Sequence, residues 1–127
     1  MSQYENVKAM VVELGFVPHT EDPEATLFVI TDEDRGILNL VVDCEEDIVR
    51  LEQVMGLITP QTDFRQLLAM NRELVHGAYA LGRQGLRIIW TDTLQIANLD
   101  QNELEGSLDA LSLAVAEHGD QLVEMLS

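Results

Sequence analysis

Residues 62–90 constrain the fold of this chain more than any other segment, because an amphipathic helix there runs directly into a tight apolar hairpin. Thr62 can cap the helix and Gly77 can end it. One polar residue, Asn71, interrupts an otherwise apolar stripe with three- and four-residue spacings. The stripe that predicts the helix consists of Phe64, Leu67, Leu68, Leu74 and Val75.

The hairpin is predicted by two short apolar runs, residues 78–81 and 86–90, joined through Gly82-Arg83-Gln84-Gly85. The two glycines permit the positive φ that a tight turn needs. A phosphate-binding loop would lead into a helix, whereas this segment leads from one strand to the next. We therefore interpret it as a hairpin turn.

The N-terminal segment predicts another helix. Ser2 and Glu5 have the form of a capping box, and apolar residues then recur with helical spacing until Gly15. Pro18 and Pro23 punctuate the next residues, which we interpret as a loop.

Three β-rich runs and one long helix complete the order of elements. The runs are residues 26–30, 37–42 and 48–54. A final amphipathic helix begins at Asp100 or Asn102, both of which are good N-cap residues. The predicted order is αβββαββα in an α+β fold.

The first two strands predict a sheet that is apolar on both faces. Leu27 and Val29 point to one face, Phe28 and Ile30 point to the other, and Leu38 should share a face with Leu40 and Val42. A sheet with one wet face would alternate polar and apolar residues, so each face needs a cover. We expect helices on one face and either the last helix or a second subunit on the other, which favours a homodimer.

Length and composition favour one globular domain over residues 1–127, since a chain of this size with 46% hydrophobic residues can bury a core without disulfides. No apolar run reaches the ~20 residues that span a bilayer. The N-terminus is polar and Cys44 is the only cysteine, so the cytoplasm is the expected location.

The charge of the chain is strongly negative and uneven, with a formal net charge of −16. Residues 1–47 hold 12 acids and two bases, and residues 88–127 hold eight acids and no base. Residues 48–87 carry five bases and three acids. Such a field repels nucleic acids and anionic membranes and favours basic or apolar partners. An acidic surface that only keeps the protein soluble explains the same composition.

No catalytic, cofactor or metal site is predicted. The segment 32–36 has the acids of a calcium loop, but its glycine is one position early and it lies between strands, so we expect a solvated turn. His19, His76 and His118 lack metal-ligand spacing and are expected at the surface or in loops. Cys44 lies among four acids, which should raise the pKa of its thiol. With no nucleophile or acid–base pair, we predict no enzyme activity.

Three residues allow two interpretations each. Asn71 either forms a hydrogen-bond latch to the backbone of a neighbouring strand or fixes register across a helix-centred dimer interface, and the latch is favoured. Tyr79 and Trp90 either stack a ligand or belong to the core or an interface, and the latter is favoured.

The chain resembles the superfamily of class I type III secretion chaperones, which share a fold with YbjN-like proteins. The resemblance rests on the αβββαββα order, on Leu67-Leu68-x-x-Asn71 followed by residues 77–81, on the 86–90 strand and on a closing acidic helix after Leu99-Asp100. It implies an antiparallel sheet packed with helices and a small acidic homodimer whose second helix and following strands pack across the twofold axis. It implies no enzyme activity and, in the chaperone branch, a dimer that wraps an extended segment of a secreted effector.

Two functions from different classes are consistent with these features. One is a chaperone-like protein that binds an extended polypeptide segment by β-augmentation and apolar pockets. The other is a stand-alone YbjN-like structural or regulatory protein without an unfolded client. An uncovered apolar patch would separate them, because a chaperone needs one after dimerisation. The predicted dimer interface comprises Phe64, Leu67, Leu68, Asn71, Leu74, Val75, Tyr79 and Trp90.

Overall fold

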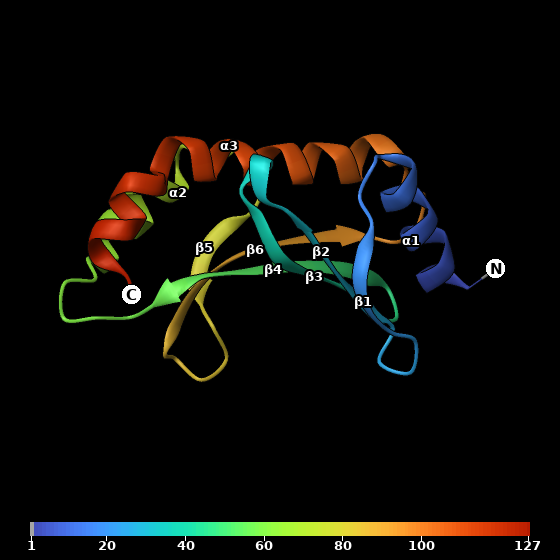
Figure 1. Cartoon of the computed structure of the whole chain (residues 1–127), viewed down its shortest axis with the longest axis horizontal. Coiled ribbons are helices and arrows are strands. Elements are labelled where there is room, and N and C mark those ends of the chain that lie inside the picture. Colours follow the sequence, from blue (N-terminus) through green and yellow to red (C-terminus); the bar gives the residue numbers. More distant parts are fainter. Residues whose placement is uncertain (1) are drawn as a thin grey trace.

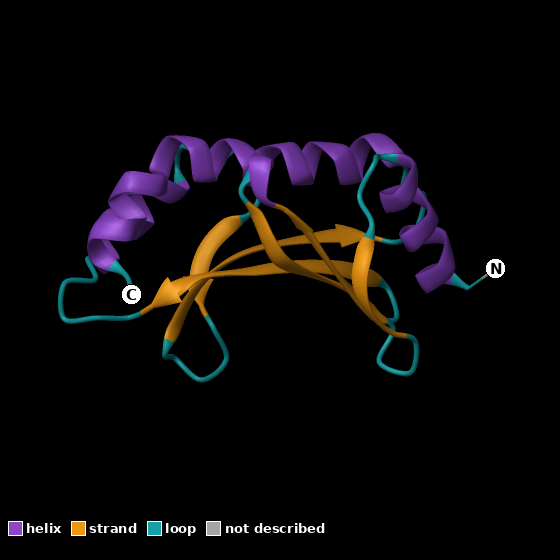
Figure 2. Ribbon diagram, in the orientation of Figure 1, coloured by secondary structure: helices purple, strands orange, loops and turns teal. Residues whose placement is uncertain are grey.

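The computed structural model describes residues 2–127, which form a six-stranded antiparallel sheet with three α-helices (Figure 1). The strands lie side by side in the order β1-β2-β3-β4-β6-β5. All three helices lie on one side of the sheet, and the long α3 crosses it (Figure 2). In chain order the elements are α1 (Gln3–Glu13), β1 (Pro18–Asp22), β2 (Leu27–Asp32), the 3-10 helix η1 (Glu33–Arg35), β3 (Ile37–Cys44), β4 (Ile48–Leu57), α2 (Phe64–Asn71), β5 (Ala78–Leu81), β6 (Arg87–Gln95) and α3 (Gln101–Met125).

The predicted α+β class with an antiparallel sheet is confirmed, but one strand was missed. Pro18–Asp22, predicted as a loop, forms the edge strand β1 and makes the order αββββαββα. Its sequence has no apolar alternation, because four of its five residues are exposed. The strand forms because the edge of β2 has backbone groups free to pair with Thr20–Asp22. Pro18 is tolerated at its start, because the first residue needs no N–H for pairing.

The alternation of β3 differs from the prediction at its first two residues, because Ile37 was expected on the face opposite Leu40. Ile37 and Leu40 are both fully buried, and Leu38, which was expected to share a face with Leu40, is exposed. Asn39 between them has a positive φ of 50°, which shifts the side-chain alternation by one position. The register against β2 also shifts here, between Ile30 and Asp32.

The helices bury one face of the sheet and leave the other without a helical cover (Figure 2). Phe28 and Ile30 are fully buried, whereas Leu27 and Val29 on the opposite face are only half-buried. The alternative that the last helix covers this second face is therefore wrong, because α3 lies with α1 and α2. The second face also carries charge, since the cross-strand partners Asp43 and Arg50 lie on it.

Helix α2 is shorter than predicted and begins at a different cap. The Asp63 side chain accepts a hydrogen bond from the Gln66 amide at 3.0 Å, so Asp63 is the N-cap in place of Thr62. Thr62 instead donates its hydroxyl to the Met125 carbonyl at 2.8 Å, which ties the helix start to the end of α3. The helix ends at Asn71, and the residues that follow form tighter turns before β5.

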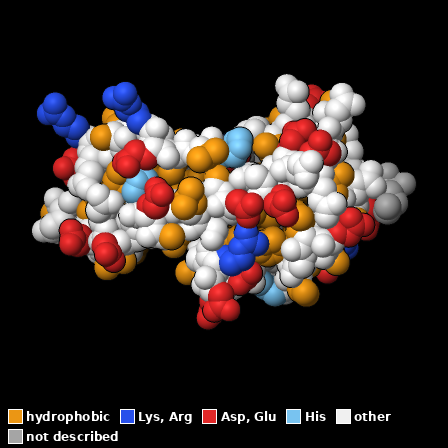
Figure 3. Space-filling view, turned by 90° about the horizontal axis from the view of Figure 1, so that it is seen from above, with side chains coloured by type: hydrophobic (Ala, Val, Ile, Leu, Met, Phe, Trp, Pro, Cys, Tyr) orange, Lys and Arg blue, Asp and Glu red, His pale blue; other side chains and the backbone are white. Residues whose placement is uncertain are grey.

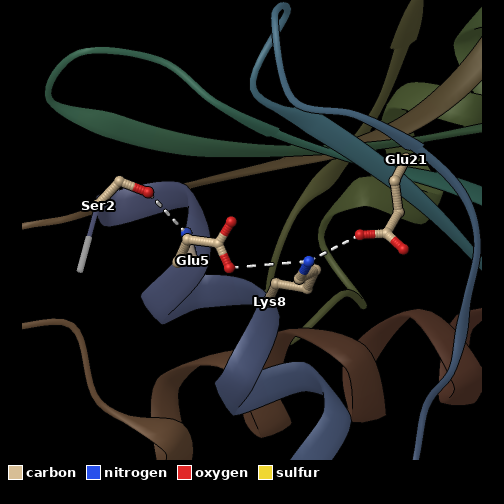
Figure 4. A network of polar contacts seen from close by, with 4 residues as sticks. All are labelled: Ser2, Glu5, Lys8 and Glu21. Atoms are coloured by element: carbon tan, nitrogen blue, oxygen red, sulfur yellow. Dashed lines mark hydrogen bonds and ion pairs between the residues drawn. The ribbon is translucent and has the colours of Figure 1, made fainter.

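Helix α1 is anchored at both its start and its middle, as Figure 4 shows. The Ser2 hydroxyl accepts the Glu5 amide at 3.1 Å, as the capping pattern predicted. Lys8 Nζ lies 2.7 Å from a Glu21 oxygen on β1 and 3.8 Å from a Glu5 oxygen. The hydrogen bond to Glu21 raises the pKa of Lys8 above its ordinary value.

Helix α3 begins at the Asp100 cap, one of the two predicted starts, through a 2.9 Å hydrogen bond from the Glu103 amide. Its apolar stripe covers the centre of the sheet, where Trp90 is fully buried. Core residues of α3 include Leu104, Leu108, Leu111, Ala114 and Leu122.

Candidate functional site

Exposed apolar side chains occur on α2, in the segment that follows it and on the β5–β6 hairpin. We call this group the α2 surface. The exposed fractions of its members range from 48% for Phe64 to 69% for Leu68. The exposed members are Phe64, Leu68, Val75, Leu81 and Leu86. Phe64, Leu68 and Leu81 line one groove, and exposed large apolar residues that lie together in this way mark a site of contact with another molecule.

The predicted interface residues fall into three groups by burial. Phe64, Leu68 and Val75 are exposed, Asn71 and Leu74 are half-buried, and Leu67, Tyr79 and Trp90 are buried in the core of the chain. A groove of about 200 Å³ lies between α2 and β5. Six of the residues that line it are Phe64, Leu67, Leu68, Asn71, Tyr79 and Leu81.

Two exposed members of the α2 surface, Leu81 and Leu86, were not among the predicted interface residues. Both lie beside the hairpin turn, where the strands leave the cover of the helices. Their position at the ends of the two apolar runs was the available sequence signal, because side chains next to a turn project beyond the packed part of a sheet.

Asn71 forms the backbone latch that the sequence favoured. Its Oδ1 accepts the Tyr79 amide at 2.7 Å, and its Nδ2 donates to the Tyr79 carbonyl at 3.2 Å. Tyr79 lies on β5, the outermost strand at this end of the sheet. One side chain therefore holds the end of α2 against the sheet and satisfies the outward-facing peptide groups of the edge strand.

A second buried polar contact joins the same strand to α3. Tyr79 Oη lies 2.7 Å from His118 Nδ1, and the Nε2 of that ring lies 3.5 Å from a Glu73 carboxylate oxygen. Burial, with the nearby charges of Glu73 and Glu117, raises the pKa of Tyr79, so its hydroxyl stays protonated. The Nε2 atom is buried, and the Glu73 carboxylate is the charged group that faces it.

The expectation that all three histidines lie at the surface or in loops is wrong for His118. His19 and His76 are exposed, but His118 is 3% exposed and lies inside α3. A lone histidine in an apolar helical stripe gave no sequence signal of its partner, because Tyr79 is far away along the chain.

Cys44 is a buried, unreactive thiol. Burial is the main cause that raises its pKa to about 11, and the neighbouring Asp43 adds to the shift. The predicted direction is confirmed, although desolvation contributes more than the acids do. Burial, followed by the negative charge of Glu45, likewise raises the pKa of Asp43.

The remaining acidic turn has no ligand-binding geometry. Residues 33–35 form η1, in which Glu33 and Asp34 are exposed to solvent. Within residues 2–127, no three His, Cys, Asp or Glu side chains are placed so that they could hold a metal ion. In the same part of the chain, no helix has the length and apolar character needed to cross a membrane.

The family of the chain follows from its whole length. The CesT_Tir_1 family model matches residues 1–127. The chain belongs to this type III secretion chaperone family. No curated protein matches the chain.

Solved structures with the same fold come from both branches that the sequence resembles. YbjN from E. coli, a putative transcription regulator, matches with a TM-score of 0.71 at 11% identity over 98% of this chain and 94% of its own. The Yersinia pestis type III secretion chaperone SycH, in complex with a fragment of YscM2, matches with a TM-score of 0.59 at 16% identity, covering 98% and 99% of the two chains. The HopA1–SchA chaperone–effector complex gives a TM-score of 0.68 at 12% identity over 91% of each chain. At these identities the likeness establishes the secretion-chaperone-like fold.

Proposed function

We propose that residues 1–127 form a single non-enzymatic domain that acts in the cytoplasm as a homodimer and holds an extended segment of a partner polypeptide. The α2 surface is the observation that carries this proposal, because it is a cluster of exposed apolar side chains on a chain with a net charge of −16. Membership of a secretion chaperone family supports it.

The α2 surface is the proposed dimer interface. Phe64, Leu68 and Val75 would make direct contacts, and buried Leu67, Tyr79 and Trp90 would support them from beneath. Two copies of this acidic chain meet with least repulsion here, because residues 48–87 carry five bases and only three acids.

Light scattering behind a sizing column tests the dimer with two matched charge insertions. Leu68→Glu places a charge in the proposed interface and is expected to give a monomer. Val12→Glu places the same charge on exposed α1 and should leave the dimer intact. A wild-type monomer at micromolar concentration and physiological salt would contradict the interface.

The partner segment is expected to be apolar with basic flanks. The acids of residues 1–47 and 88–127 would attract Lys and Arg at its edges and speed the encounter. Association should therefore slow as salt rises, whereas dissociation from apolar contacts should change little.

The test of this function is a reconstituted complex with a partner captured from native cells. Hydrogen exchange of the purified partner should show a segment that is unprotected when free and protected when bound, and kinetics across a salt series should show the expected slowing. A partner that binds through a folded domain would contradict the chaperone-like role.

The second candidate is a stand-alone YbjN-like structural or regulatory protein without an unfolded client. The likeness to YbjN, with a TM-score of 0.71, favours this alternative. Capture of no polypeptide at all, from cells that produce a dimer, would support it over the first.

A further inference from the structure

The pairing of β3 with β4 covers only part of each strand. These strands pair only where Val41–Cys44 meets Val49–Glu52. Before Val41, β3 rises with η1 to the middle of α3, whereas β4 runs on beside β6 toward the C-terminal end of α3 (Figure 1). Gly36 marks the upper contact, because a Cβ there would lie 2.6 Å from Val115 Cγ1.

A side-chain amide occupies the position where a neighbouring strand would pair with β3. Gln53 Nε2 donates to the Gly36 carbonyl at 3.0 Å, and Gln53 Oε1 accepts the Leu38 amide at 2.9 Å. Gln53 is only 3% exposed. One residue of an added strand would offer the same donor and acceptor to these peptide groups.

The edge of β4 that faces β3 already pairs with the C-terminal residue Ser127 at one end. The Leu57 amide donates to the Ser127 carbonyl at 2.7 Å, and the Ser127 amide donates to the Leu57 carbonyl at 2.9 Å. Gly56 leaves room for this segment, since a Cβ there would lie 2.8 Å from Leu126 Cβ. Within residues 2–127, no strand pairs with the β3-facing edge of β4 between Glu52 and Leu57, so Met55 has no strand partner on that edge.

Apolar side chains line the groove of about 350 Å³ between these edges and α3. Leu38 and Val54 are each about half exposed, and Val123 is 78% exposed. Gly119 of α3 also lines the groove, and a Cβ built there meets nothing within 4 Å. The apolar lining from the sheet and α3 comprises Leu38, Val54, Met55, Val115, Leu122 and Val123.

We propose that this groove, which we call the β3–β4 groove, seats an extended segment of a partner polypeptide that runs antiparallel to β4. This rests on the proposed function and names the place where the segment binds. The direction follows from Ser127, which pairs antiparallel with the same edge.

The charges beside the groove define the chemistry of the segment. Asp120 and Glu124, next to Gly119 and Val123 in sequence, are exposed on α3, which contains no Lys or Arg, and Asp34 is exposed on η1. Seen from above, the surface shows acidic side chains interspersed with apolar ones and a few Lys or Arg side chains (Figure 3). The segment therefore carries alternating apolar residues with Lys or Arg at its ends, whereas a second copy of this acidic chain would be repelled.

The test is selection of a displayed library of random 12-residue peptides against the whole protein, followed by binding measurements on variants. Gly119→Trp fills the groove where a Cβ has open space and should weaken the selected peptides at least tenfold. Gly119→Ala and Leu113→Trp, on the same helix but with Leu113 outside the groove, should bind as the wild type does. Hydrogen exchange should show new protection at Met55, whereas the Leu38 amide, already bonded to Gln53, should change little.

A second variant keeps the test decisive if Gly119→Trp does not fold. Val123→Arg changes an exposed side chain at the groove and should repel the basic-flanked peptides. Selected peptides that bind all variants equally would overturn the groove and leave the proposed function standing. Failure to select any peptide would count against both, and loss of a dimer in Gly119→Trp would make a second copy the occupant.

Discussion

The two ends of the sheet are held in different ways. At the α1 end, the helix buries Tyr4, Val7 and Val11 in the core and adds an exposed ion pair to β1. At the α2 end, the helix buries only Leu67 and Met70. Its place is fixed instead by hydrogen bonds, chiefly those of Asn71 to β5.

Helix α1 therefore buries its apolar face in the core, whereas α2 keeps part of its apolar face exposed. A helix held mainly by packing has its apolar face covered, whereas a helix held by directional hydrogen bonds can keep apolar side chains exposed and still stay in place. Leu68 on α2 is 69% exposed, although Thr62 ties the start of the helix to α3 and Asn71 ties its end to β5. The α2 end is therefore the one that we expect to meet a partner.

The strongest test of the α2 end is Gly77→Ala. Gly77 has a φ of +77°, and a Cβ there would lie 2.6 Å from the buried Trp90 ring. Strain and overpacking together should lower the free energy of unfolding by about 3 kcal/mol or more. Gly85→Ala is the matched control, because its φ of +72° is similar and nothing lies within 4 Å. Equal losses in urea unfolding would show that the Trp90 contact does not hold this end.

The packed α1 end is tested by the alkaline stability of the protein. The folded chain keeps Cys44 protonated up to about pH 11, but the unfolded chain ionises it near its ordinary pKa of 9.0. The stabilisation is complete below pH 9 and is lost as the pH rises to 11, in total about 2–3 kcal/mol. Cys44→Ala should lack this component of the pH dependence. Parallel curves for the two proteins would mean that the thiol is not sealed from water.

Asn71→Leu tests whether hydrogen bonds hold α2. The Tyr79 peptide groups would lose both partners, which should lower the free energy of unfolding by about 2 kcal/mol. Arg72→Leu, the next residue and exposed, should change it by less than about 0.5 kcal/mol. An unchanged thermal midpoint and oligomer for Asn71→Leu would remove the basis of the comparison.

The smallest effect is expected from the ion pair at the α1 end. Lys8→Met should lower the thermal midpoint by less than any of the changes above, because Lys8 and Glu21 are both partly exposed to solvent and salt. A double-mutant cycle with Glu21→Gln, at low and high salt, measures the pair itself. A coupling as large as the effect of Asn71→Leu would show that polar contacts also hold α1.

Local signals in the sequence predicted the parts of the fold that depend on near neighbours. Ser2 and Asp100 cap their helices as expected, because a cap bonds to an amide three residues away. The Asn71 latch was predicted as well, since Tyr79 follows only eight residues later and a polar residue in an apolar stripe needs a partner.

Features that depend on distant pairing could not be predicted in the same way. The PHTED segment becomes β1 only because β2 has a free edge, and His118 is buried because Tyr79 faces it across the fold. Asn39 adopts a positive φ where β3 turns toward α3, a conformation that its own sequence neighbourhood did not indicate.

By itself the sequence determined the α+β class, most helix and strand positions, the acidic charge and the resemblance to secretion chaperones. Only the tertiary structure decided that all helices share one face, that α2 remains apolar and exposed, and that Gln53 fills a gap between β3 and β4. The physical reason is range, because periodicity and capping act within a few residues along the chain. Which edges stay open depends on which distant segments pair.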